Sequence, residues 1–339
     1  MLKRVWFQWN FDHSRLRPSD NTQWEKHCID SKHLCYDKLR GLGTDGASAI
    51  TGKVNGAVQL IINKQLASQT GNSKCQAIGC HCAAHKLNLA ATQAGDSIQY
   101  VKQFKEIIRQ LFDFYNNSAV RAAGLLAIQK LLDEPELKVL QPSSTRWLST
   151  GNCVVRLKKI LGSIIISLGR EFEERGDAAA GLNKFLSEYQ FIATLLLFCD
   201  VLPTINRLSK IFQDQDVDYA LLATVVESTK NALSKLRDGD GKNLKDIQLY
   251  IEMLEEHGVT VTYNKRNLRS GSSDPTETKK SFDENIKLKF VDNLIANLDA
   301  WFTDSDIMAA FRIFEPKAFT VPLTQDKADE DNDAESETD

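Results

Sequence analysis

The sequence predicts a small α/β core of few strands joined to a large all-helical region, so that the chain is predominantly helical overall. Two observations carry this prediction. Between residues 38 and 93, short runs of β type alternate with helical periodicity in the order strand, helix, strand, helix, which is typical of a partly parallel sheet. After Gly95, apolar residues recur at helical spacing through most of the remaining chain.

The α/β part contains four expected elements. They are a strand over 39–45, a helix over 47–65, a strand over 75–82 and a helix over 83–93. The first strand ends at Asp45, and Gly46 permits a tight turn into the helix that follows. Residues 1–36 are aromatic and polar without a clean period, so no element is assigned to them.

The rest of the chain is expected to form helices over 98–112, 157–168, 182–212, 220–236, 244–254, 282–301 and 305–314. Pro203 should kink or break the long helix 182–212. Residues 264–280 contain Gly271 and Pro275 and only one large apolar side chain, that of Leu268, which indicates an exposed linker. Pro316 should end the last helix.

Composition limits the class of protein. The formal net charge is −3, and residues 326–339 carry eight acids and one lysine, so this tail has −7 and the rest of the chain +4. The tail is expected to be disordered. Seven irregularly spaced cysteines do not suggest a disulfide framework, which favours a reducing compartment. No apolar run reaches the ~18 residues of a membrane span, and no signal-peptide core is present, so neither membrane insertion nor secretion is expected.

Asp45 is the strongest candidate for chemistry. Phosphoryl transfer by two metal ions needs carboxylates clustered around Mg²⁺, and an Asp at the end of a strand presents its side chain at the rim of a sheet. The alternative interpretation is that Asp45 caps the following helix, and on the residues alone this alternative is preferred.

Cys82 and His85 form a C-x-x-H pattern at the start of an expected helix, close to Cys80 and His81. Zinc would need four nitrogen or sulfur ligands, and no second ligand pair follows at finger spacing, so zinc is not expected. Cys28, His33 and Cys35 could supply such a pair only if the fold brought them close. The simpler interpretation is a buried cysteine and a capping histidine.

Arg146 and Trp147 follow a Pro-Ser-Ser-Thr loop at 142–145. A guanidinium pairs with phosphate and an indole stacks on an extruded base, so this pair suits nucleic acid. The alternative is a tryptophan that anchors the start of a helix, which is the commoner role of such a residue.

These segments, in this order and with helical sequence between them, resemble the transposase core of the hAT superfamily of DNA transposons. The matching residues are Thr44-Asp45-Gly46-Ala47 for "TD-x-A", Cys82 and His85 followed by Leu87-Asn88-Leu89, and Arg146-Trp147. The resemblance covers about residues 38–319, and it is nearest to animal hAT-derived proteins, domesticated or decayed, that are related to those with appended zinc fingers. It implies a partial ribonuclease H-like core of few strands with a large all-α insertion.

The resemblance also implies a division of the chain and roles for its residues. The implied parts are an irregular N-terminal segment (1–37), a partial ribonuclease H-like core (38–150), a helical insertion domain (151–257), a linker loop (258–281), C-terminal helices returning to the core (282–319) and a disordered acidic tail (320–339). Asp45 would be the second of three acids that hold Mg²⁺. His85 would lie near the active centre and help to handle the DNA end. Trp147, beside Arg146, would stabilise a flipped base.

The chain departs from the family in its acids. No convincing strand precedes Asp45 to carry the first acid, and the last acid is expected in a C-terminal segment that here turns acidic and stops. One carboxylate of three cannot hold two metal ions. Asp45 is therefore expected to be a vestigial metal-binding acid, and the protein is not expected to be an enzyme.

The sequence thus predicts a transposon-derived nuclear protein that binds DNA, protein partners or a second copy of itself, without a cofactor. Two alternatives stay open: an active transposase that uses Mg²⁺ or Mn²⁺ with acids from unassigned positions, and a purely helical protein-interaction scaffold. A cytoplasmic location is the alternative to the nucleus. No small-molecule substrate is expected, since Gly41-Leu42-Gly43 lacks the third glycine of a dinucleotide fingerprint.

Overall fold

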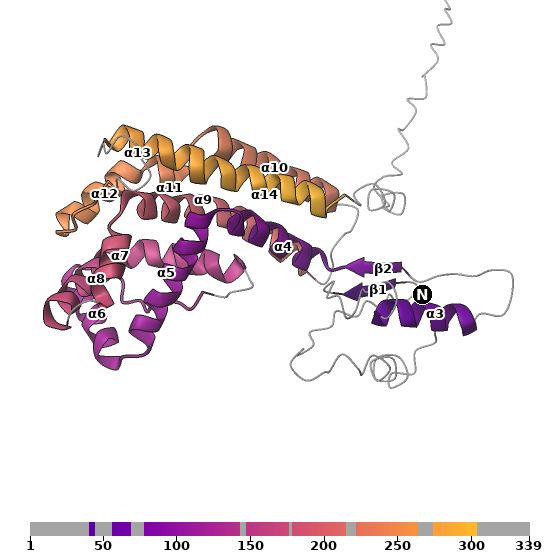
Figure 1. Cartoon of the computed structure of the whole chain (residues 1–339), viewed down its shortest axis with the longest axis horizontal. Coiled ribbons are helices and arrows are strands. Elements are labelled where there is room, and N and C mark those ends of the chain that lie inside the picture. The colour runs from indigo at the N-terminus through magenta and orange to yellow at the C-terminus, as the bar shows by residue number, and fades with distance from the viewer. Residues whose placement is uncertain are drawn as a thin grey trace, which may run out of the picture.

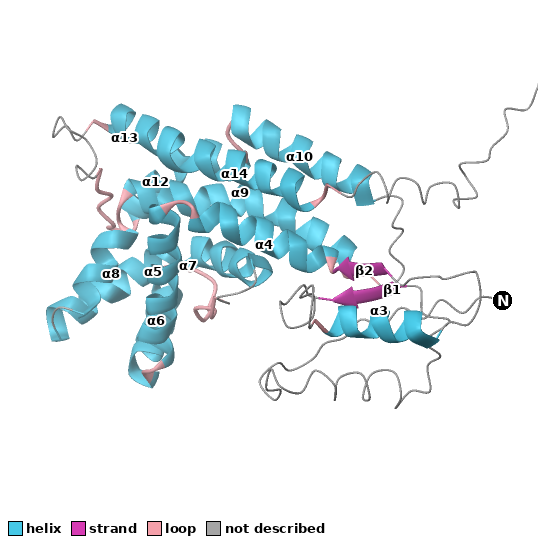
Figure 2. Ribbon diagram, turned by 45° about the vertical axis from the view of Figure 1, so that its right-hand side comes forward, coloured by secondary structure: helices cyan, strands magenta, loops and turns pink. Residues whose placement is uncertain are grey.

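The structure is a computed structural model, which describes residues 41–44, 56–68, 78–142, 147–175, 178–214, 222–263 and 274–303. This part of the chain is predominantly helical, with one pair of strands at one end of a helical bundle (Figures 1 and 2). Its elements are β1 (Gly41–Thr44), α3 (Ala57–Ser68), β2 (Ile78–His81), α4 (Ala83–Asp96), α5 (Gln99–Asn116), α6 (Ala119–Leu131), α7 (Trp147–Arg175), α8 (Ala178–Leu186), α9 (Tyr189–Phe212), α10 (Leu222–Asp238), α11 (Lys242–Lys245), α12 (Ile247–Glu256), α13 (Pro275–Phe282), the π-helical turn η6 (Asp283–Lys287) and α14 (Leu288–Trp301).

The two strands pair in parallel, with Gly41 opposite Ile78 and Thr44 opposite His81. Helix α3 packs against β2 so closely that a Cβ atom at Gly79 would lie 3.0 Å from the Val58 side chain. β1, α3, β2 and α4 follow one another in the predicted order. Two strands of four residues are too little to identify a ribonuclease H-like core, which stays a prediction.

Helix α9 lies at the centre of the bundle, and its residues from Phe191 to Cys199 are all buried. It packs against α7, α10, α11 and α4, and its apolar side chains belong to one continuous core that extends from Leu87 in α4 to Leu298 in α14. α9 is also long and apolar enough to cross a membrane by composition, with a mean hydropathy of 1.5 in the relevant window. Since 72% of that window is buried within the protein, its apolar character is that of a core helix.

The long helix expected over 182–212 is divided, but not at Pro203, where α9 continues. The interruption falls at Ser187 and Glu188, because these residues are engaged by a distant segment of the chain. The Thr262 amide donates to the Ser187 carbonyl at 2.9 Å, and the Tyr189 amide donates to the Thr262 carbonyl at 2.9 Å. A tertiary contact, and not the proline, therefore sets the start of α9.

Two of the boundaries expected from the sequence do not coincide with the ends of helices in the structure. The division between residues 150 and 151 falls inside α7, which begins at Trp147. The expected linker 258–281 was wrong in its last part, because α13 begins at Pro275 with Asp274 as its N-cap. The Asp274 carboxylate accepts from the Thr276 amide at 2.9 Å, and proline suits the first position of a helix. The pair Asp274-Pro275 thus begins a helix, although the same two residues in the sequence are equally compatible with a turn.

Helix α11 is capped by a side chain from another helix. The Asp200 carboxylate, on α9, accepts hydrogen bonds from the amides of Asn243 at 3.0 Å and Leu244 at 2.9 Å. Gly241 precedes this helix, and a Cβ atom there would lie 2.3 Å from the Asp200 carboxyl carbon. The glycine is required because the carboxylate approaches the backbone so closely.

Replacement of Phe198 tests how much the core around α9 contributes to the free energy of unfolding. Its ring lies 5.3 Å from that of Phe104 in α5 and 5.0 Å from that of Phe290 in α14, and it is fully buried. Phe198→Ala should lower the free energy of unfolding by about 3–5 kcal/mol, because it leaves a cavity where three helices meet. Chemical denaturation measures this change. Phe172→Ala is the matched control, since Phe172 is 46% exposed, and its loss should stay below about 1 kcal/mol. Equal losses in the two variants would contradict the central role of α9.

Candidate nucleic-acid interface

The parallel strands bring the ends of two motif segments to one edge of the sheet. Thr44, the last residue of β1, lies opposite His81, the last residue of β2. The Cys82 amide donates to the Thr44 carbonyl at 2.7 Å, so the pairing continues to the point where α4 begins. Asp45 follows Thr44 directly in the sequence but lies outside the described residues.

The C-x-x-H pattern spans the start of α4. Cys82 occupies the N-cap position, with φ −55° and ψ 122°, and its carbonyl accepts from the Lys86 amide at 2.9 Å. The Cys82 side chain makes no capping hydrogen bond and is a free, half-buried thiol. His85 lies in the first turn of the helix and is also half-buried. The simpler interpretation of Cys82 as a buried cysteine is thus met only in part, since its side chain is half-buried where the sheet ends.

Three aromatic rings from three elements meet beside this helix start. The ring of His81, at the end of β2, lies 5.4 Å from that of His85 in α4 and 5.8 Å from that of Trp301 in α14. The contact with Trp301 is edge-to-face, at an interplanar angle of 86°. The Trp301 indole nitrogen donates to the Gln93 side chain at 2.9 Å, which fixes the orientation of the ring. We call His81, His85 and Trp301 the aromatic cluster.

Helix α14 reaches this cluster because polar side chains fix it along α4. Asn293 donates to the Ser97 hydroxyl at 2.8 Å, and Asn297 donates to the Ala90 carbonyl at 3.0 Å. Together with Trp301, these residues recur every four positions and so lie on one face of α14. Trp301 was not among the site residues expected from the sequence. The sequence pattern that could have identified it is the spacing of Asn293, Asn297 and Trp301. These hydrogen-bond donors lie four residues apart, at the edge of an apolar helix face.

The third motif is described only in part. Arg146 lies outside the described residues, and of Trp147 only the backbone is described, as the first residue of α7. The start of α7 is fixed on α9, since a Cβ atom at Gly151 would lie 2.4 Å from the side-chain nitrogen of Asn206. The structure therefore brings His85 together with His81 and Trp301, whereas the positions of Asp45 and of the Arg146 and Trp147 side chains stay predictions.

Most of the residues considered as ligands of magnesium or zinc lie outside the described part of the chain. Within the described ranges, no three His, Cys, Asp or Glu side chains converge as metal ligands. Asp45, Cys28, His33 and Cys35 lie outside these ranges, and so does the side chain of Cys80. Neither a magnesium site at Asp45 nor a zinc site is tested by this geometry.

No protein-family model matches the chain, and no solved structure matches it. The likeness to hAT transposases therefore depends on the sequence motifs alone.

The half-buried position of Cys82, in contrast to the buried Cys153 and Cys199, predicts selective modification. Burial raises the pKa of the Cys153 thiol to about 11 and that of Cys199 to about 12, so both are almost entirely neutral near pH 7. A maleimide reagent should label Cys82 at least about tenfold faster than either buried cysteine. Mass spectrometry of peptides from the native protein measures the rates, and the unfolded chain is the control, in which the three should react alike. Equal labelling in the native state would contradict the described burial.

Proposed function

We propose that this chain is a transposon-derived, hAT-like protein that no longer cuts DNA and binds nucleic acid through the edge formed by β1, β2 and the start of α4. The protein acts in the nucleus under this proposal, alone, as a homodimer or with protein partners. It requires no cofactor.

The parallel pairing of β1 with β2 is the observation that carries this proposal. The segment that resembles "TD-x-A" and the segment that resembles the C-x-x-H motif are far apart in the sequence, and a hAT-like centre needs them together. The hydrogen bond of 2.7 Å between the Cys82 amide and the Thr44 carbonyl joins these two segments directly. Asp45 is the next residue after Thr44 in the chain.

The path of the chain gives further support. After α4 the chain passes through the helices from α5 to α13 and then returns along α4 as α14, through Asn293, Asn297 and Trp301. The hAT resemblance implies such a return of the C-terminal helices to the core after a helical insertion. This path is compatible with the resemblance, although a last helix packed beside an early one also occurs in simple helical bundles.

The aromatic cluster suits contact with nucleic acid. Half-exposed rings offer flat apolar faces on which bases stack, a contact worth about 1–3 kcal/mol per base. Under this proposal the third motif adds the guanidinium of Arg146 and the indole of Trp147, since a guanidinium pairs with phosphate and an indole stacks on a base. The proposed interface therefore combines stacking surfaces with a cation, without base-specific groups.

The proposal that the protein does not cut DNA follows from the metal ligands that the motifs supply. They supply one carboxylate, Asp45, where a two-metal centre needs several acids to hold both ions. Asp45 is accordingly proposed as a vestige of a metal centre, and His85, Arg146 and Trp147 as binding residues.

Binding to DNA provides the first test. Fluorescence anisotropy should show single-stranded and duplex DNA bound with an affinity that falls as salt rises, because phosphate contacts release counterions. Arg146→Ala with Trp147→Ala should weaken binding at least about tenfold, since one stacked base alone contributes about 1–3 kcal/mol.

Arg109→Ala is the matched control for charge. Arg109 is an exposed residue on α5 that pairs with Glu106 at 2.6 Å and Asp113 at 2.7 Å, so its removal changes the net charge equally without touching the proposed interface. Its affinity should match that of the unmodified chain. No salt-dependent binding, or an equal loss in Arg109→Ala, would overturn the proposal.

Cutting provides the second test. A supercoiled plasmid incubated with the protein and Mg²⁺ or Mn²⁺ should stay intact. Asp45→Ala is the control, and nicking that disappears in this variant would show an active metal-dependent transposase instead.

A helical interaction scaffold is the second candidate function. Leu249 and Met253 support it, since they lie one turn apart on α12 and are 68% and 36% exposed. If DNA binding is absent while Leu249→Ser with Met253→Ser abolishes capture of a defined partner protein, the scaffold is the better description.

A further inference from the structure

One surface of α7 gathers cations that have no acidic partner. Arg156, Lys158 and Lys159 lie on α7, Lys138 lies in the loop between α6 and α7, and Lys242 begins α11. Within the described part of the chain, none of the five forms an ion pair with a carboxylate. The three outer lysines, at 138, 159 and 242, are exposed, and the other two residues are half-buried. We call these five residues the basic strip.

Hydrogen bonds bring the three elements of the basic strip together. On one side of α7, the Arg156 guanidinium donates to the Lys138 carbonyl at 3.4 Å. On the other side, the Lys158 ammonium donates to the side chain of Asn243 at 2.5 Å, and Asn243 follows Lys242 in α11. Because an α-helix turns about 100° per residue, Lys159 projects between Arg156 and Lys158. The strip is therefore continuous across α7.

Most of the acids beside the basic strip are engaged elsewhere. The Asp200 carboxylate caps α11, as described above. In the loop before α7, Glu136 pairs with Lys130 at 3.5 Å, and the side chain of Glu134 is only 10% exposed. Asp246, just after α11, is exposed. The surface thus keeps a clear excess of positive charge.

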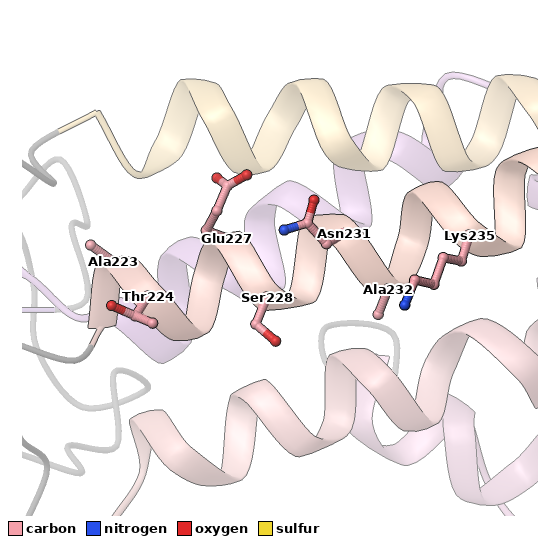
Figure 3. Close-up of a pocket in the computed structure, with 7 residues that line it drawn as sticks. All are labelled: Ala223, Thr224, Glu227, Ser228, Asn231, Ala232 and Lys235. Atoms are coloured by element: carbon pink, nitrogen blue, oxygen red, sulfur yellow. The ribbon is translucent and has the colours of Figure 1, made fainter.

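Other surfaces of the bundle are mixed in charge. Between α10 and α14, Lys230 pairs with Asp299 at 2.6 Å. The open face of α10 carries Glu227 as well as Lys235, among small neutral side chains (Figure 3). The basic strip differs from these surfaces because its cations come from three elements and are unpaired.

We propose that the basic strip binds the phosphate backbone of duplex DNA. Lysine and arginine neutralise phosphates without reading sequence, so such a surface adds affinity and orients the duplex. The inference rests on the proposed function, to which it adds a second contact surface on the helical part of the chain.

The position of the strip on α7 favours DNA over an acidic protein segment as its ligand. Helix α7 begins at Trp147, in the motif proposed to contact nucleic acid. Arg156 lies about 14 Å further along the helix, at 1.5 Å per residue. This length corresponds to about four base pairs of duplex at 3.4 Å each, so one duplex can contact the start of α7 and the strip together.

The salt dependence of DNA binding tests this surface in the full chain. Lys138→Gln, Lys159→Gln and Lys242→Gln are combined in one variant, and binding of labelled duplex DNA is followed by fluorescence anisotropy over a range of salt concentrations. The variant should bind at least about tenfold more weakly. The slope of log K against log salt should fall by about two to three, since each lost phosphate contact removes about 0.9.

The matched control removes the same charge from other helices. Lys102→Gln, Lys184→Gln and Lys289→Gln change exposed lysines of α5, α8 and α14 that form no ion pair with the described residues. This variant should keep the slope of the unmodified chain. Thermal melting by circular dichroism checks that both variants fold, as expected for changes at exposed positions.

The outcomes separate this inference from the proposed function. Equal slopes in the strip variant and the control variant, with DNA still bound, would overturn the inference alone. No binding by the unmodified chain would overturn the inference and the proposed function together. If a polyglutamate peptide bound as tightly as DNA and lost its affinity in the strip variant, the strip would be a site for acidic proteins instead.

Discussion

The burial of α9 is the constraint on which the rest of the described structure depends. From Phe191 to Cys199 this helix is buried around its whole circumference, so this part is stable only when other helices cover it on every side. The bundle provides that cover with α7, α10, α4 and α11. Two polar side chains on α9 find partners within the fold: Thr194 donates to the Gln190 carbonyl at 2.7 Å, and Asp200 caps α11. Any change in the path of α9 would therefore move several helices together.

The position of α14 follows from this arrangement and connects the bundle to the proposed interface. One face of α14 contributes Phe290 to the core around α9, while another carries the amides that hold α4. A third contact, to α10, is made by exposed ion pairs, which each stabilise by at most about 1 kcal/mol. Because α14 is fixed mainly by burial, Trp301 is presented beside His81 with little freedom.

Much of the helical content could be predicted from the sequence, because amphipathic periodicity is a local property. The same holds for the strands, since each ends beside a turn or helix signal near Asp45 and Cys82. The start of α13 was missed because Asp274 and Pro275 serve a turn and a helix start equally well, and only burial of Phe282 decides between them. The division at Ser187 was missed because it depends on Thr262, which is remote in the sequence.

The sequence by itself determined most of the helical segments, and it supplied the motifs on which the nucleic-acid proposal rests. These are properties of composition and short-range spacing. Only the tertiary structure decided that Thr44 and Cys82 are joined by a backbone hydrogen bond, and that Trp301 completes a cluster with His81 and His85. Such contacts join residues far apart in the chain. Local sequence patterns do not predict them, because they depend on how separate elements pack their apolar faces against one another.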